Sequence, residues 1–287
     1  MKSIGDILPE PHASFLGGLT VGARRSMPQD LLDDFRKVGV IHIVVLSGYN
    51  VTIIARALAG FLGLFLPWMA SIFAGIIGII LFTILTGAAA PVVRASIMAI
   101  FIYTAHATGK VNRVIIALLI AGTFMLIQNP KILRFDPSFQ LSFVATLGLI
   151  YLAPYFERKL QWLPKRFNIR EAATATISAQ IAVTPLILSM MGTFSVVALP
   201  VNMLVLLSVP YAMFFGFIAG VLGWISHIIA FPFTWIAYLL LEYELRIVDI
   251  FSSLPFAQIS IPYFPAAGAI ILYMLIGWWV MRRSKMS

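Results

Sequence analysis

The chain has 287 residues, 61% of them hydrophobic and only 11% charged, and it carries a net charge of +9. Soluble domains carry about 25% charged residues, so this composition excludes an ordinary soluble protein and predicts a polytopic membrane protein, while the absence of cysteine excludes disulfides and thiolate metal sites. The positive charge fits the basic bias of cytoplasmic loops, and it fits attraction of a polyanion such as nucleic acid.

Residues 1–40 are predicted to form interfacial amphipathic helices that lead into the membrane. The stretch PEPHASFLGGLTVGARR holds a short helix that is rich in small residues. A second helix is expected to follow Ser26, because Pro28 suits its first turn and Asp30 favours the positive end of its dipole.

Residues 41–281 are predicted to form the transmembrane domain, followed by a basic tail at 282–287. A spanning helix needs about 20 apolar residues. By that rule the candidate spans are 41–66, 68–87, 92–108, 112–128, 138–156, 172–192, 196–211, 212–230 and 264–281. Residues 232–254 fit either an interfacial helix or one end of a span. The fold class expected is therefore all-α: a transmembrane helical bundle of about nine spans with broken or kinked helices.

The basic segment Glu157–Glu171 sets the expected orientation. Placing that segment in the cytoplasm puts the N-terminus outside, and nine spans would bring Arg282, Arg283 and Lys285 inside. One span more or fewer would reverse the side of the C-terminus.

The segment Val38–Arg56 carries polar residues within an apolar run: His42, Ser47, Gly48, Tyr49, Asn50 and Thr52. Unpaired polar groups are costly in hydrocarbon, so such a cluster faces protein or a water-filled cavity. The Ser-Gly pair favours a kink or break.

Arg94 stands in TGAAAPVVRASIM, three residues after Pro91. An arginine near the end of a span can snorkel to the interface. Alternatively, Pro91 opens a helix whose free N–H groups and Arg94 together favour an anionic ligand such as phosphate.

Two polar stripes follow in later spans. Asp136 before Pro137 is predicted to cap a helix in which Ser142 lies on one face and Gln140 on a neighbouring face. The second stripe has a spacing of four residues and comprises Thr176, Gln180 and Thr184, with Thr174 and Ser178 beside it. Hydrogen bonds between helices explain most hydroxyls in spans, and a polar interior is the alternative.

Several catalytic classes find no support in the sequence. No GxxxxGK[ST] motif is present, so we expect no ATP hydrolysis by that route, and no HExxH or other metal-ligand spacing is present. His42 and Ser47 lie about 140° apart around a regular helix, so an intramembrane Ser/His hydrolase would need a helix break at Gly48. We expect the chain not to be an enzyme and to hold no metal or cofactor.

Four stretches occur in an order and spacing that resemble the ComEC/Rec2 family of competence proteins: LGGLTVG, FRKVGVIHIVVLSG, TGAAAPVVRASIM and DPSFQLSFVATLGLIYLAP. The resemblance covers nearly the whole chain. It implies an inner-membrane, multi-pass channel that passes single-stranded DNA during natural transformation. The matching positions are His42, Ser47, Gly48, Arg94, Asp136, Gln140 and Ser142, whereas Asn50 stands where the family often has a second histidine.

The resemblance also implies partners. Family members carry an OB-like domain and a metallo-β-lactamase-like domain, and neither lies within these residues. The candidate partners are therefore single-stranded DNA, the lipid bilayer, a DNA-translocating helicase and separately encoded OB-like or metallo-β-lactamase-like domains. Residues expected to line the channel or break its helices are His42, Ser47, Gly48, Asn50, Arg94, Gln140, Ser142, Thr176, Gln180 and Thr184. A carrier for another anion and the Ser/His hydrolase remain alternatives. Oligomeric state, including a homo-oligomer, stays open, as does whether the chain is a fragment, a split gene or a reduced homologue.

Overall fold

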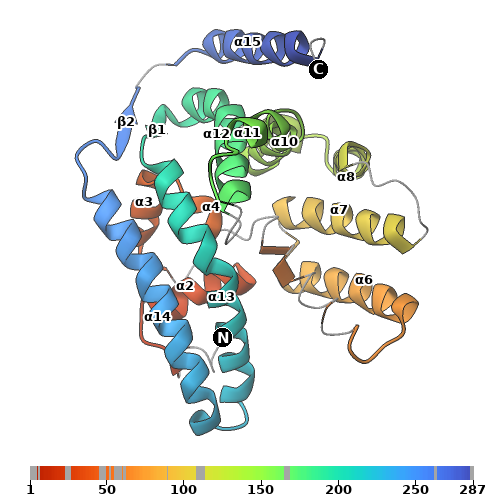
Figure 1. The fold of residues 1–287 in the computed structure, drawn as a ribbon, viewed down its shortest axis with the longest axis vertical. Coiled ribbons are helices and arrows are strands. Elements are labelled where there is room, and N and C mark those ends of the chain that lie inside the picture. The colour runs from red at the N-terminus through yellow and green to blue at the C-terminus, as the bar shows by residue number, and fades with distance from the viewer. Residues whose placement is uncertain are drawn as a thin grey trace. The chain divides into compact units, whose positions relative to one another are not determined.

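The computed structural model, drawn in Figure 1, describes residues 5, 7–22, 27–44, 50, 51, 53, 54, 60, 63–88, 90–107, 114–164, 169–261 and 264–284. Helices dominate these residues, so the prediction of an all-α membrane protein is confirmed. The chain divides into two compact units. Unit 1 comprises Met1–Gln29, Ile41–Phe139 and Ser208–Tyr243, and unit 2 comprises Asp30–Val40, Gln140–Leu207 and Glu244–Ser287.

Three helices of the described part are long and apolar enough to cross a membrane: α12 (Ile169–Met191), α13 (Ala198–Gly223) and α14 (His227–Ser252). A fourth span can be formed by α10 (Pro137–Tyr151) and α11 (Ala153–Lys159), which are bent by 49° at Leu152. Shorter apolar helices are Met69–Leu85, Val92–Phe101, Val114–Gln128 and Ala266–Arg282.

The boundaries of α13 and α14 differ from those expected. Residues 196–211 and 212–230 were expected as two spans, but α13 continues through Pro210 to Gly223. An interior proline removes one backbone hydrogen bond, and neighbouring helices in membrane proteins compensate for that loss. The ambiguous segment 232–254 belongs to α14, a single helix of 26 residues.

Unit 1 contains α2 (His12–Val21), α4 (Ile41–Val44), α6 (Trp68–Leu85), α7 (Ala90–Ala107), α8 (Val114–Gln128) and α9 (Ile132–Phe135). Helix α7 packs against both α6 and α8. Helix α2 is buried along most of its length, with Phe15, Leu16 and Leu19 fully enclosed, and the interfacial position expected for residues 1–40 stays a prediction. Gly216 of α13 permits this packing, because a Cβ at that position would lie 2.5 Å from a methyl group of Leu16.

Unit 2 contains α3 (Gln29–Lys37), α10, α11, α12 and α15 (Ala266–Ser284). Helix α3 is amphipathic, as predicted, and buries Leu32 and Phe35 while Asp33 and Arg36 form an exposed ion pair. A short antiparallel ribbon, which the sequence did not predict, joins β1 (Thr193–Ser195) to β2 (Gln258–Ser260), with Phe194 opposite Ile259. Helix α12 packs against α11, α15 and β1, so it is the centre of this unit.

Candidate membrane-interior site

The candidate site in unit 2 is built on α10 and α12. The predicted cap of α10 is confirmed, because the carboxylate of Asp136 accepts hydrogen bonds from the backbone N–H groups of Ser138 at 2.8 Å and Phe139 at 3.2 Å. Gly148 then lets α10 approach α12 closely. A Cβ on Gly148 would lie 2.7 Å from the carbonyl oxygen of Ser178, so only glycine fits at this crossing.

Four hydroxyl or amide oxygens in unit 2 are buried, and they neither donate nor accept a hydrogen bond within the part of the chain that the structure describes. They are those of Ser142 on α10, Thr174 and Ser178 on α12, and Asn202 on α13. Thr174 and Ser178 are four residues apart and therefore share one face of α12. The exposed fraction of Ser178 is 0%. Each unsatisfied buried polar group costs about 1–3 kcal/mol, so these residues are candidates for a functional role.

The predicted stripe on the neighbouring face of α12 has different surroundings. The side-chain amide of Gln180 donates to the carbonyl oxygen of Ser195 at 3.5 Å, a contact at the limit of hydrogen-bond length. The hydroxyl of Thr184 donates to the carbonyl oxygen of Gln180 at 2.6 Å, within its own helix. Thr176 is buried, and Gln140 of α10 is half-buried. The structure thus brings Gln180 and Thr184 together and ties the stripe to β1.

Pro185 interrupts the hydrogen bonds of α12 near this stripe. A proline has no N–H, so the carbonyl of Ile181 loses its donor within the helix. Close to this break, the hydroxyl of Tyr273 on α15 donates to the carbonyl oxygen of Ala182 at 3.0 Å. This contact holds α12 to α15 one residue after the carbonyl that Pro185 leaves without its donor within the helix.

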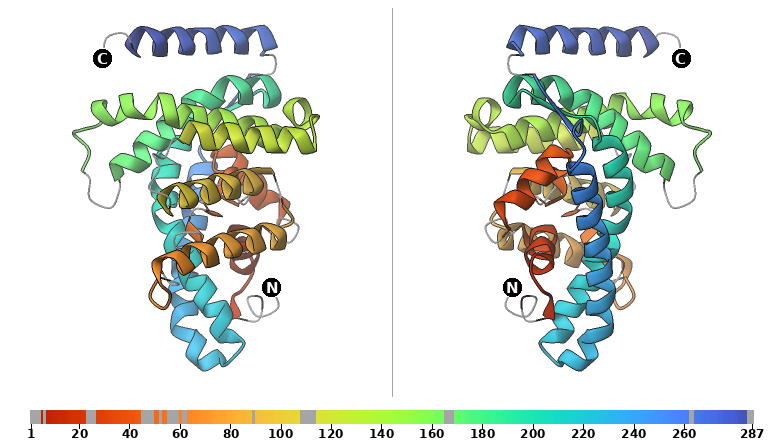
Figure 2. Two further views of the ribbon diagram at one scale, coloured as in Figure 1. Left: turned by 90° about the vertical axis from the view of Figure 1, so that its right-hand side faces the viewer. Right: turned by 90° about the vertical axis from the view of Figure 1, so that its left-hand side faces the viewer.

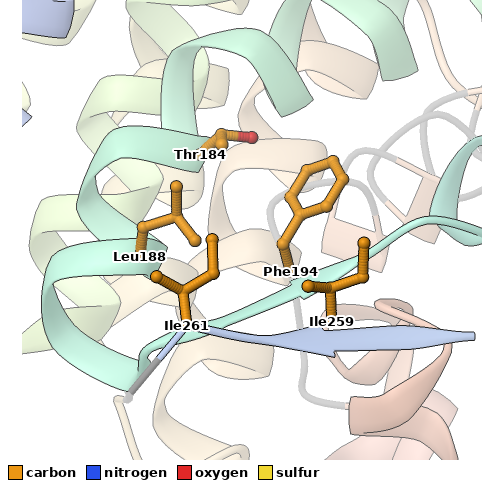
Figure 3. A pocket seen from close by; sticks show the side chains of 5 residues that line it. All are labelled: Thr184, Leu188, Phe194, Ile259 and Ile261. Carbon is orange, nitrogen blue, oxygen red and sulfur yellow. The ribbon is translucent and has the colours of Figure 1, made fainter. Parts of the chain in front are cut away.

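An open pocket of about 240 Å³ lies between α12 and the β-ribbon (Figure 3). Its lining is Thr184, Leu188, Phe194, Ile259 and Ile261. Four of these five side chains are apolar, so the pocket offers almost nothing to a phosphate or a base edge. This pocket is therefore not part of the candidate site for a polar or anionic substrate.

In unit 1, Arg94 is the unusual residue. It lies on α7 with an exposed fraction of 8%, beside a core cluster of Val51, Val92 and Ala95 on which Phe82 packs. Removing an ionised group from water costs several kcal/mol. A buried guanidinium in such surroundings is therefore a candidate functional group. Two residues along α7, the hydroxyl of Ser96 is hydrogen-bonded to that of Thr83 on α6 at 2.7 Å.

Asn50 is fully buried and acts as a clip between helices. Its side-chain amide donates to the carbonyl oxygens of Leu19 at 3.1 Å and Ile43 at 3.4 Å, joining the end of α2 to α4. His42 is exposed on α4. Ser47 and Gly48, where we predicted the helix break, lie outside the described residues.

The sequence analysis missed a partly buried pair in unit 1. His12, the first residue of α2, contacts Glu242 of α14 with its Nε2 atom 2.9 Å from Oε2, and its ring stacks on Tyr238 with centroids 4.4 Å apart. Tyr238 and Glu242 are four residues apart and so share a face of α14. The spacing of Tyr238 and Glu242 was the only signal of this pair in the sequence, because His12 and Glu242 are 230 positions apart.

Among the described side chains, no three His, Asp or Glu residues lie together in a way that could hold a metal ion. The expectation that the chain holds no metal or cofactor remains a prediction.

Comparison with known proteins identifies the family of this sequence. The sequence profile of the competence protein family matches residues 19–286. ComE operon protein 3 of Bacillus subtilis (strain 168) is 28% identical over 231 residues, which cover 75% of this chain and 27% of that protein. The chain thus spans about a quarter of the length of the curated relative it matches, and no solved structure matches it. Because the family profile covers nearly every residue, this chain belongs to the competence protein family.

Proposed function

We propose that this chain forms the membrane passage through which single-stranded DNA crosses the cytoplasmic membrane during natural transformation. Membership of the competence protein family over residues 19–286 is the observation that carries the proposal. The long apolar helices support a multi-pass membrane location, and the buried polar oxygens of unit 2 supply groups that such a passage needs.

The chemistry of these groups suits a strand in motion. Conduction requires contacts that are favourable enough to admit the substrate and weak enough to release it. Hydroxyls such as those of Thr174 and Ser178 can donate to phosphate oxygens without a fixed charge that would trap a polyanion. Arg94, a buried cation in unit 1, would add attraction for the phosphates.

The energy and the strand processing would come from elsewhere. The sequence has no nucleotide-binding GxxxxGK[ST] loop and no HExxH motif, so we propose that the chain is not itself an enzyme. A DNA-translocating helicase would pull the strand. OB-like and metallo-β-lactamase-like domains would bind and process the incoming DNA, and the inner membrane would be the site of action.

The proposal is tested by deleting the gene in its native host and restoring it alone. The measured quantity is labelled DNA that becomes resistant to external nuclease. We expect that DNA to disappear on deletion and to return with the wild-type chain. Normal uptake in the deletion strain would contradict the proposal, and measurement of anion flux and of serine-probe labelling would then examine the carrier and the hydrolase.

A further inference from the structure

A cationic corner of unit 2 lies where α11 meets α15. The rings of Tyr155 on α11 and Trp279 on α15 pack edge to face with centroids 4.6 Å apart, and α12 packs against both helices. Figure 2 shows α11 and α15 running in the same direction, toward the side of the C-terminus. Their last turns therefore lie at one end of the unit.

Basic side chains gather at that end. Arg158 and Lys159 occupy the last turn of α11 and are exposed, as is Arg282 near the end of α15. Arg170, in the first turn of α12, donates to the carbonyl oxygens of Gln161 at 2.5 Å and Leu163 at 2.6 Å. That contact holds the backbone of Gln161 and Leu163, just after α11, against the start of α12, so the charge of Arg170 lies at the same end.

Acidic side chains only partly balance this charge. Glu157 and Glu171 are exposed nearby, so the four described basic side chains outnumber the two acidic ones. The surplus faces solvent or headgroups, where an anion can reach it.

Exposed aromatic side chains lie beside the basic residues of this corner. The guanidinium of Arg282 lies 5.3 Å from the ring centroid of Trp278, which holds the charge against an indole that is 55% exposed. Trp162 lies between the two residues whose carbonyl oxygens Arg170 contacts, and it is 76% exposed. Exposed tryptophans beside arginines and lysines are typical of the boundary between headgroups and acyl chains. Preceding turns of α15 expose an apolar surface with Ile271, Met274 and Leu275.

We propose that this corner, formed by Arg158, Lys159 and Arg282, binds the headgroup of an anionic phospholipid such as phosphatidylglycerol. The guanidinium groups would hold the phosphate through paired N–H donors, and Lys159 would add a point charge. The acyl chains would lie along the apolar surface of α15. A nucleic-acid strand shares the phosphate chemistry, but it would not use that apolar surface.

Such a site would also determine on which side of the membrane the end of α15 lies relative to α11, which the span count left open. A lipid headgroup that contacts both α11 and α15 requires the C-terminal ends of these two helices to lie at the same membrane surface. This inference goes beyond DNA passage and does not depend on it.

The test uses the purified full chain in nanodiscs of phosphatidylcholine, with and without phosphatidylglycerol. The readouts are the thermal unfolding midpoint and the lipid retained in native mass spectrometry. We expect phosphatidylglycerol to raise the midpoint and to remain bound. The triple variant Arg158→Gln, Lys159→Gln, Arg282→Gln should lower its affinity roughly 100-fold, because each basic residue near an anionic surface contributes about fivefold.

Arg134→Gln is the matched control. Arg134 is also exposed and also lies over an aromatic ring, 5.6 Å from the centroid of Phe135, but it precedes α10 and so stands at the opposite end of the bent α10–α11 pair. Its loss should leave the phosphatidylglycerol effect unchanged.

Three results would overturn the proposal: equal stabilisation by phosphatidylcholine, an unchanged effect in the triple variant, or the same stabilisation by inorganic phosphate or by a short single-stranded oligonucleotide. Measuring DNA uptake in the triple variant separates the two proposals. Retained uptake with lost lipid preference supports the lipid site and leaves DNA passage standing.

Discussion

Removing two hydroxyls from α12 should stabilise the protein and impair it at the same time. The variant is Thr174→Val with Ser178→Ala, which keeps the shape of each side chain nearly constant. Neither hydroxyl has a hydrogen-bond partner in the described part of the chain, and both are buried. Each such group costs about 1–3 kcal/mol. In a bilayer the unfolded helix also finds partners, so we take the lower bound for each and expect the free energy of unfolding to rise by about 2 kcal/mol.

Uptake should change in the opposite direction. If each hydroxyl donates to the passing strand with a net hydrogen bond of about 1 kcal/mol, the loss of both lowers the rate of DNA import about 10- to 30-fold. Import is measured as nuclease-protected labelled DNA, abundance as protein in the membrane fraction, and stability as the thermal midpoint of the purified chain. A variant that gains stability and loses DNA import is the result expected when polar groups serve function at a cost in stability.

Thr234→Val is the matched control for this variant. Its hydroxyl donates to the carbonyl oxygen of Ala230 at 3.0 Å within α14, so its loss should cost a few tenths of a kcal/mol to about 1 kcal/mol and leave uptake intact. A double variant that is more stable yet imports DNA normally would refute the functional interpretation. A double variant that is clearly less stable would show that the two hydroxyls have structural partners.

Four further predictions concern single contacts. Gly148→Ala should destabilise the protein by about 1–3 kcal/mol in thermal unfolding, because its Cβ would lie 2.6 Å from that of Ala182, whereas Gly277→Ala, with nothing within 4 Å, should not. Asn50→Leu should cost about 1–3 kcal/mol by the same assay, since the carbonyls of Leu19 and Ile43 lose a donor; full stability would show that the clip contributes nothing. His12→Phe keeps the stacking on Tyr238 but removes the ring nitrogen that contacts the carboxylate of Glu242. A double-mutant cycle with Glu242→Gln should give a coupling energy of about 1–3 kcal/mol rather than zero. Arg94→Gln should lower DNA uptake without lowering the amount of protein; unchanged uptake would remove Arg94 from the strand path.

Local patterns predicted the parts of the fold that depend on nearby residues. The cap formed by Asp136 and the amphipathic helix α3 follow from residue chemistry over one or two turns, and both are present. Apolar length located α6, α7, α8, α12 and α15 to within a few residues. Pro210 misled the prediction, because a proline signals a break only where no neighbouring helix compensates for the lost hydrogen bond.

The candidate site was harder to predict because it depends on which helix faces meet. Periodicity showed that Thr174 and Ser178 share one face of α12 and that Thr176, Gln180 and Thr184 form another. It could not show that Gly148 of α10 lies against the first face. The His12–Glu242 pair was invisible for the same reason, since nothing local links residues on α2 and α14.

The most direct test of the strand path uses the absence of cysteine from the chain. Ser178→Cys introduces a single thiol of similar size, and Thr234→Cys serves as the control position. The rate of modification by a membrane-impermeant thiol reagent is measured in competent cells, with and without added DNA. Ser178 has no exposed surface in this structure, so our account predicts that the thiol introduced by Ser178→Cys reacts only while DNA is being imported, when the helices part around the strand, and that the control is indifferent to DNA. A thiol at position 178 that stays unmodified during active uptake would contradict the claim that this face of α12 lines the passage.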